Sequence, residues 1–307
     1  MKPVRKIRVF LLIGGLVLAA GLFAGYFLFQ PPEPEPLPHP NGYDDFVAAG
    51  EMLKGEVPGE KTGTLEECRQ FVSANREALA RGRLGLAKEC RVPTEYSSTW
   101  LQRHLNQIMA TRKLGHAFCV EGELAMLEKR PGDAASNYLT VIKMGARLGH
   151  GGLMIDGLIA TACEEEGAIF LEPEVGTLDI EQSRKLIAEL EKVESEQEPS
   201  AQIIKHEKKW VRAVLRSFDG IKMFVSEAAA TRSLNPAQTE QKNFLARYEA
   251  RLQWALQLKA KLAARAYALE QGRLSASWND LVPAYLKSVP NVPFGPGDTN
   301  RLSFKAD

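Results

Sequence analysis

The chain has 307 residues, of which 45% are hydrophobic and 25% are charged, and this composition excludes a wholly disordered protein. The formal net charge of +1 argues against the overall basic character typical of nucleic-acid binding, so no nucleic-acid partner is expected. The length leaves room for about two domains.

The N-terminal charge pattern points to a membrane anchor. Four basic residues lie within residues 1–8, and residues 9–29 carry no charge. As an α-helix this apolar segment would be about 32 Å long, which matches a bilayer hydrocarbon core of about 30 Å. A cleaved signal peptide is the alternative, but its apolar region is shorter and ends at a site of small residues. The sequence therefore predicts a cytoplasmic basic segment at 1–8 and an uncleaved transmembrane helix at 9–29.

The orientation of this helix follows from its flanking charges. Basic residues precede it, whereas Glu33 and Glu35 follow it. Because basic residues are retained in the cytoplasm, the N-terminus should stay cytoplasmic. We therefore expect a single-pass protein of the cytoplasmic (inner) membrane with a periplasmic or extracytoplasmic C-terminal domain.

Residues 30–42 form a proline-rich stalk in this interpretation. Six prolines lie between Gln30 and Pro40. Proline fixes φ and lacks an amide hydrogen, so such a run favours polyproline II at about 3.1 Å per residue. A stiff spacer beside the membrane is expected, and a ligand for a proline-recognition domain is the alternative.

Residues 43–271 are predicted to form a mainly α ectodomain, a bundle of about eight helices. Local signals fix the ends of the helices in a first group. These signals are a Thr64–Glu67 capping box, a break at Arg91-Val92-Pro93 and a helix start at Pro131. Ser98 or Thr99 should cap the longest helix of this group. The expected helices cover residues 44–54, 65–90, 99–130, 131–148 and 153–170.

A second group begins at a capping pattern, Asp179–Gln182, whose helix should end near Glu196. The two helices that follow carry apolar seams with heptad spacing, so they should pair antiparallel. The first seam consists of Ile204, Val211, Val214, Phe218, Ile221, Val225 and Ala228. The second consists of Leu245, Tyr248, Leu252, Ala255, Leu262, Ala266 and Leu269. Residues 272–307 should form a small irregular tail with a hairpin ending at 302–304.

One pair of helices has the spacing of a tetratricopeptide hairpin. Phe118, Gly122, Ala134 and Tyr138 occupy the positions that take large and small residues in that repeat. No second copy lies 34 residues away, and Glu121 stands where the repeat has leucine. The sequence predicts one tetratricopeptide-like hairpin, with an ordinary tight helix pair as the alternative.

Four cysteines, Cys68, Cys90, Cys119 and Cys163, would lie outside the cytoplasm, where disulfides are permitted. If the helices on either side of residue 94 fold back on each other, Cys68 and Cys119 should lie close together. Four buried free thiols are the alternative.

Metal and cofactor signals are absent from the sequence. The histidines show no i, i+3 or i+4 pair: His104 and His116 are distant on one helix, and His206 is expected on a charged face. The run Glu164–Glu166 is expected at a solvated edge, because consecutive helical positions diverge. No catalytic, cofactor-binding or metal-binding residue is assigned, and no cofactor is expected.

Three segments resemble a family of uncharacterised bacterial proteins with one N-terminal membrane helix and a helical ectodomain. They are Asn41–Phe46, Cys90–Tyr96 and Gly151–Asp156. The resemblance spans most of the chain and implies an architecture but no activity.

The C-terminal region is similar to the tail of the major pseudopilins of type II secretion. The similar segments are Gly272–Ser275, Asp280–Val282, Tyr285–Leu286 and Pro290–Gly295. The prepilin processing signal is absent from the N-terminus, so the resemblance implies a shared structural unit at 272–307.

These observations predict a non-catalytic, membrane-anchored envelope protein, either a scaffold or a protein-interaction module with a protein partner. An accessory component of a secretion apparatus is one alternative. The other is an envelope hydrolase that uses a helix-borne acid or Cys119 with His116 or His150. A perturbed acid or thiol in a deep pocket would favour the hydrolase, and an open groove between helices would favour binding.

Overall fold

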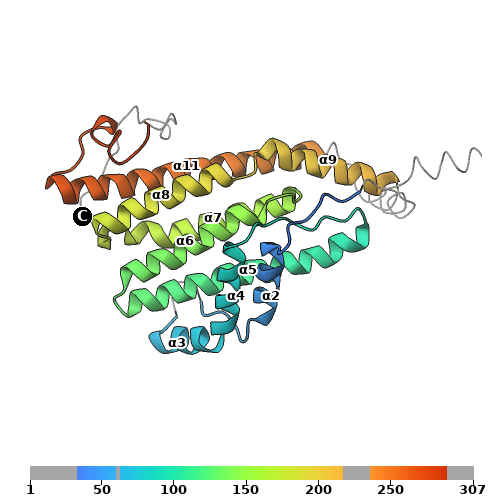
Figure 1. The fold of residues 1–307 in the computed structure, drawn as a ribbon, viewed down its shortest axis with the longest axis horizontal. Helices are drawn as coiled ribbons and strands as arrows, with labels where there is room; N and C mark the ends of the chain where they lie inside the picture. Colours follow the sequence, from blue (N-terminus) through green and yellow to red (C-terminus); the bar gives the residue numbers. More distant parts are fainter. Residues whose placement is uncertain (1–32, 60–62, 217–235, 289–307) are drawn as a thin grey trace, which may run out of the picture.

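The computed structural model describes residues 33–59, 63–216 and 236–288, which form an elongated stack of α-helices (Figure 1). The described ranges contain no β-strand. Within them, no helix combines the length and apolarity that a membrane span requires. The segment 9–29 and the expected hairpin at 302–304 lie outside these ranges. The prediction of a mainly α fold is confirmed for the part of the chain that is described.

The first layer consists of α2 (Gly42–Met52), α3 (Leu65–Ala74) and α4 (Arg76–Leu86). The single helix expected over 65–90 is wrong, because the chain breaks at Asn75. The Asn75 side chain accepts from Lys54 N at 2.7 Å and donates to Lys54 O at 3.0 Å. These bonds tie the α3–α4 junction to the end of α2. The capping box at Thr64 and Glu67 is confirmed.

The centre of the stack is α5 (Ser98–Leu127), α6 (Pro131–Leu148) and α7 (Met154–Leu171). Ser97 caps α5, one residue before the expected position. Small residues let these helices approach closely: a Cβ on Gly122 would lie 2.3 Å from the Tyr138 ring. A Cβ on Gly145 would lie 2.7 Å from the Ala160 carbonyl oxygen.

The other long side of the stack begins with the short 3-10 helix η1 (Glu172–Thr177). It continues with α8 (Ile180–Glu196), α9 (Ser200–Arg216) and α11 (Pro236–Gln271). The capping box predicted at Asp179 is confirmed. In Figure 1, α11 runs along α8, and its main packing partners are α8 and α7. The expected pairing of α11 with α9 is limited, within the described residues, to a small cluster in which Phe244 packs with Ile203 and Ile204.

The predicted apolar seams are only partly correct: Ile204, Val214, Leu262 and Ala266 are buried, but three other members are exposed. On α11, Leu252 and Leu269 are 42% and 39% exposed, and on α9 Val211 is 38% exposed. The buried positions include Phe244, Arg251, Leu258, Leu262 and Ala266 on α11, and Ile203, His206, Trp210 and Val214 on α9. Each stripe includes a buried polar residue, Arg251 or His206, which apolar patterning assigns to the surface. Phe218, Ile221, Val225 and Ala228 lie outside the described residues.

After α11 the chain turns back at Gly272, whose φ of +68° suits glycine, and forms the short helix η2 (Trp278–Asp280). Tyr285 packs edge-on against Tyr267 of α11, with ring centroids 5.8 Å apart. Leu281 and Leu286 are buried in the main core. The described part of the tail is therefore attached to the bundle.

Candidate functional site

An extended segment between α4 and α5 forms one wall of the site. Asn41 Nδ2 donates to Arg91 O at 2.8 Å, and Arg91 N donates back to Asn41 Oδ1 at 3.0 Å. Further along, Thr94 Oγ1 donates to Gly151 O in the α6–α7 turn at 3.1 Å. These bonds hold the segment and fix the backbone of Arg91 at the edge of a pocket.

Helix α9 forms the facing wall. Trp210 Nε1 donates to the Glu95 carbonyl at 2.9 Å, which fixes the helix against the extended segment. Lys209 Nζ lies 5.6 Å from the centre of the Tyr96 ring. A hydrogen bond with Tyr96, and secondarily the nearby Glu35 carboxylate, raises the pKa of Lys209, so this ammonium stays charged at neutral pH.

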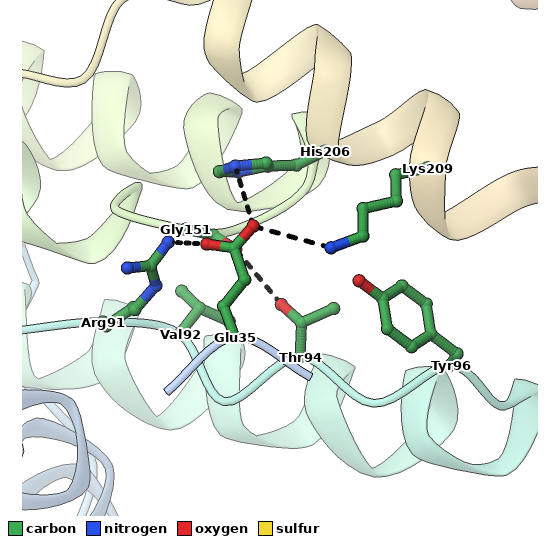
Figure 2. A pocket seen from close by; sticks show the side chains of 8 residues that line it. All are labelled: Glu35, Arg91, Val92, Thr94, Tyr96, Gly151, His206 and Lys209. Carbon is green, nitrogen blue, oxygen red and sulfur yellow. Dashed lines mark hydrogen bonds and ion pairs between the residues drawn. The ribbon is translucent and has the colours of Figure 1, made fainter. Parts of the chain in front are cut away.

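The carboxylate of Glu35 lies between these walls (Figure 2). Arg91 Nη2 donates to Glu35 Oε2. The other oxygen, Oε1, lies 3.6 Å from Lys209 Nζ and 3.9 Å from His206 Nε2. Three basic side chains from segments far apart in the sequence therefore converge on one acid. We call this arrangement the Glu35 clasp.

The Glu35 clasp corrects the prediction of a proline-rich stalk at residues 30–42 for its described part, residues 33–42. Glu35 is ion-paired to the ectodomain, and Leu37 and Pro38 are partly buried. Asn41, at the end of the segment, is buried and caps α2. The described part of the proline-rich segment therefore lies on the bundle, because its acid finds basic partners there.

The pocket around Glu35 is filled, whereas the adjoining surface of α9 is open. The space that remains beside Glu35 is about 20 Å³, enough for about one water molecule. An open hollow of about 810 Å³ adjoins it along α9. Its cationic lining residues are Lys205, Lys208, Lys209 and Arg212.

A second polar group, Tyr43–His104–Asp156, is buried in the core. His104 Nε2 lies 2.7 Å from Asp156 Oδ1, and the Tyr43 hydroxyl lies 3.3 Å from His104 Nδ1. The His104 ring stacks on Trp100 at 4.4 Å. Burial, followed by the Asp156 charge, raises the pKa of Tyr43 well above its usual value. Because Tyr43, His104 and Asp156 are only 1%, 0% and 2% exposed, the group connects α2, α5 and α7 and offers a substrate no access.

The expectation that Glu164–Glu166 form a solvated edge is wrong for two of the three residues. Glu164 is 3% exposed, and both its carboxylate oxygens lie 3.3 Å from Arg251 Nη1. Glu166 pairs with His116 Nδ1. Only Glu165 is exposed. The expectation that His206 lies on a charged surface is also wrong, because it is 8% exposed.

The four cysteines are free and buried, as the alternative hypothesis held. Burial raises the pKa of Cys90 and Cys163 to about 12. Burial, and then the neighbouring Glu166 carboxylate, raises the pKa of Cys119 well above its usual value. His116 is ion-paired to that same Glu166, so the surroundings of Cys119 oppose a thiolate.

We therefore predict that the native full-length chain resists thiol alkylation. At pH 8, iodoacetamide should modify none of the four cysteines rapidly, because a buried neutral thiol is a poor nucleophile. Unfolding in guanidinium chloride should expose all four, and mass spectrometry counts the adducts in each state. Fast labelling of Cys119 in the folded chain would contradict this and favour the hydrolase hypothesis.

Within the described ranges, no group of three or more His, Cys, Asp or Glu side chains is arranged to hold a metal ion. No site residue was predicted from the sequence, so the Glu35 clasp was not expected. A local signal did exist: Glu35 is an acid within a proline run, where a spacer needs none. The sequence contained no signal for its partners, since Arg91 follows 56 residues later and His206 and Lys209 lie on α9.

No family model, curated protein or solved structure matches this chain.

Proposed function

We propose that this protein is a non-catalytic, membrane-anchored envelope protein, whose ectodomain is held near the bilayer as a scaffold or protein-interaction module. The observation that carries the proposal is the Glu35 clasp. It attaches the segment that follows the proposed transmembrane helix directly to α9 and to the extended segment at Arg91.

The clasp limits the distance between the ectodomain and the proposed anchor. Glu35 lies only six positions after Phe29 in the sequence. At about 3.1–3.6 Å per residue this interval spans roughly 20 Å. The α9 end of the bundle would then lie near the membrane, and the rest of the long stack would project away from it.

The described acids and thiols support a non-catalytic role. Glu164 is paired with Arg251 in the interior, and Asp156 contacts His104 and accepts a hydrogen bond from the Leu153 amide. The thiols are buried with raised pKa values. Hydrolysis by an acid or a thiol would need a side chain that lies in an open pocket and has a pKa that is lowered or close to the working pH. None of these groups meets both conditions.

Two finer assignments accompany this proposal. We propose that α5 and α6 form a tetratricopeptide-like hairpin, supported by the close contact of Gly122 with Tyr138. We also propose that the C-terminal tail is a pseudopilin-like unit, which makes an accessory role in a secretion apparatus the second candidate. The burial of Tyr285 and Leu286 against the bundle supports a structural role for that tail.

A topology measurement tests the central proposal. A reporter that is active only outside the cytoplasm, fused after Asp307, should be active in cells. Mass spectrometry of the membrane fraction should find a chain with an intact N-terminus. A soluble mature chain that starts between residues 25 and 40 would overturn the anchor.

A further inference from the structure

The exposed face of α9 is strongly basic. Helix α9 contains five lysine and arginine residues and one acid, Glu207. Glu207 faces the bundle, where its Oε2 accepts from Met154 N at 2.9 Å. Lys205, Lys208 and Arg212 are exposed on the open hollow. Their spacing of three and four residues places them on one side of the helix.

These three cations have no ion-pair partner among the described residues. Lys209, by contrast, is engaged by Glu35 in the clasp. Surface cations elsewhere on the bundle commonly have acidic partners, such as Arg103 with Glu95 and Lys143 with Glu189. The α9 face therefore presents a local excess of positive charge on a chain whose net charge is only +1.

The position of this face in the fold favours a membrane as its partner. The described chain begins beside α9, at one end of the long stack in Figure 1. The short connection keeps Glu35, which the clasp joins to α9, within roughly 20 Å of Phe29, where the proposed membrane helix ends. Headgroups occupy about 5–8 Å of that interval, and the Debye length at physiological salt is about 8 Å. Extended lysine and arginine side chains cover much of the remaining distance.

We propose that Lys205, Lys208 and Arg212 bind the headgroups of anionic phospholipids in the membrane that holds the anchor. The proposal rests on the proposed function, because it requires the anchor at 9–29. The attraction is that between opposite charges, and the short connection supplies a high effective concentration. The clasp and the lipid contact together would fix the bundle with its α9 end toward the bilayer.

Lysine labelling of the full-length chain tests this contact. The protein is reconstituted into nanodiscs of phosphatidylcholine alone or with phosphatidylglycerol, and exposed amines are acetylated with a membrane-impermeant reagent. In discs with phosphatidylglycerol, Lys205 and Lys208 should react about threefold more slowly than in discs without it. Lys129, exposed in the α5–α6 turn, is the internal control and should react equally in both. The protection should largely disappear at 1 M salt, where the Debye length is about 3 Å.

A matched pair of variants gives an independent measurement. Native mass spectrometry of the detergent-purified chain reports whether phosphatidylglycerol is retained in preference to phosphatidylcholine. Changing Lys205, Lys208 and Arg212 together to glutamine should abolish that preference. Changing the exposed Lys113, Lys129 and Lys185 to glutamine removes the same charge elsewhere and should preserve it.

The outcomes separate the two proposals. If the chain enters both kinds of disc but Lys205 and Lys208 label equally in them, the lipid contact is wrong and the anchor stands. Equal lipid preference in the two triple variants would also overturn the contact. If the chain enters neither disc, the anchor is wrong and this inference is overturned with it.

Discussion

Replacing Arg251 by alanine is expected to lower the unfolding temperature of the full-length chain by about 10 °C at pH 8. Arg251 and Glu164 are 4% and 3% exposed, and their pairing connects α11 to α7. The guanidinium also lies 4.1 Å from the centre of the Tyr248 ring. Without it, the Glu164 carboxylate keeps only its bond from Gln197 Nε2, at 2.5 Å. Leaving one buried charge without its partner costs about 3–5 kcal/mol.

The stability lost on replacing Arg251 should be larger at high pH than at low pH. Burial raises the pKa of Glu164 from 4.5 to about 7, against the lowering effect of Arg251. Because the pKa of Glu164 is raised in the folded state, its contribution to the free energy of unfolding is fully present below about pH 4.5. That contribution is lost as the pH rises through about 7. At pH 5 the carboxyl is mostly protonated, so Arg251→Ala should cost less there than at pH 8.

Two further variants identify the cause of the loss. Arg103→Ala removes an exposed pair with Glu95, whose side chains are 66% and 55% exposed, and should change stability by less than about 1 kcal/mol. Combining Arg251→Met with Glu164→Gln removes both buried charges and should recover most of the loss. If Arg251→Ala and Arg103→Ala had the same small effect at both pH values, the buried pair would be disproved.

The sequence predicted those parts of the fold that local chemistry controls. The capping boxes at Thr64 and Asp179 and the helix start at Pro131 depend only on residues within one turn, and all three are confirmed. The break at Asn75 was missed because its cause is a contact with Lys54, which is distant in sequence. Apolar periodicity predicted only part of the α9 and α11 seams, because polar residues, His206 and Arg251, also occupy buried positions.

Less of the candidate site than of the fold could be predicted from the sequence. The Glu35 clasp requires an extended segment held by Asn41, an α9 helix fixed by Trp210, and the α6–α7 turn beside them. Each of these placements follows from tertiary packing. A basic helix and an acid in a proline run are visible in the sequence, but their juxtaposition is not.

Replacing Gly50 by alanine is expected to destabilise the chain by about 3 kcal/mol, the upper end of the usual cost of overpacking. Gly50 lies where α2 crosses α5. A Cβ there would lie 2.1 Å from the Ala110 carbonyl oxygen and 2.4 Å from its carbonyl carbon. Both atoms belong to the backbone of a long helix, so no side-chain rotation can relieve the clash. The two helices would have to separate, and the unfolding temperature should fall by about 6–10 °C.

The matched control is Gly176→Ala in η1, where no atom lies within 4 Å of the new Cβ. Its effect should stay within about 0.5 kcal/mol. Both variants add the same methyl group, so the difference between them isolates the α2–α5 contact. Thermal unfolding of the full-length chain in detergent, followed by near-ultraviolet circular dichroism, measures that difference. Because α2 begins directly after the segment that carries Glu35, a destabilised α2 should also weaken the Glu35 clasp. Indistinguishable unfolding temperatures for the two variants would refute the crossing at Gly50.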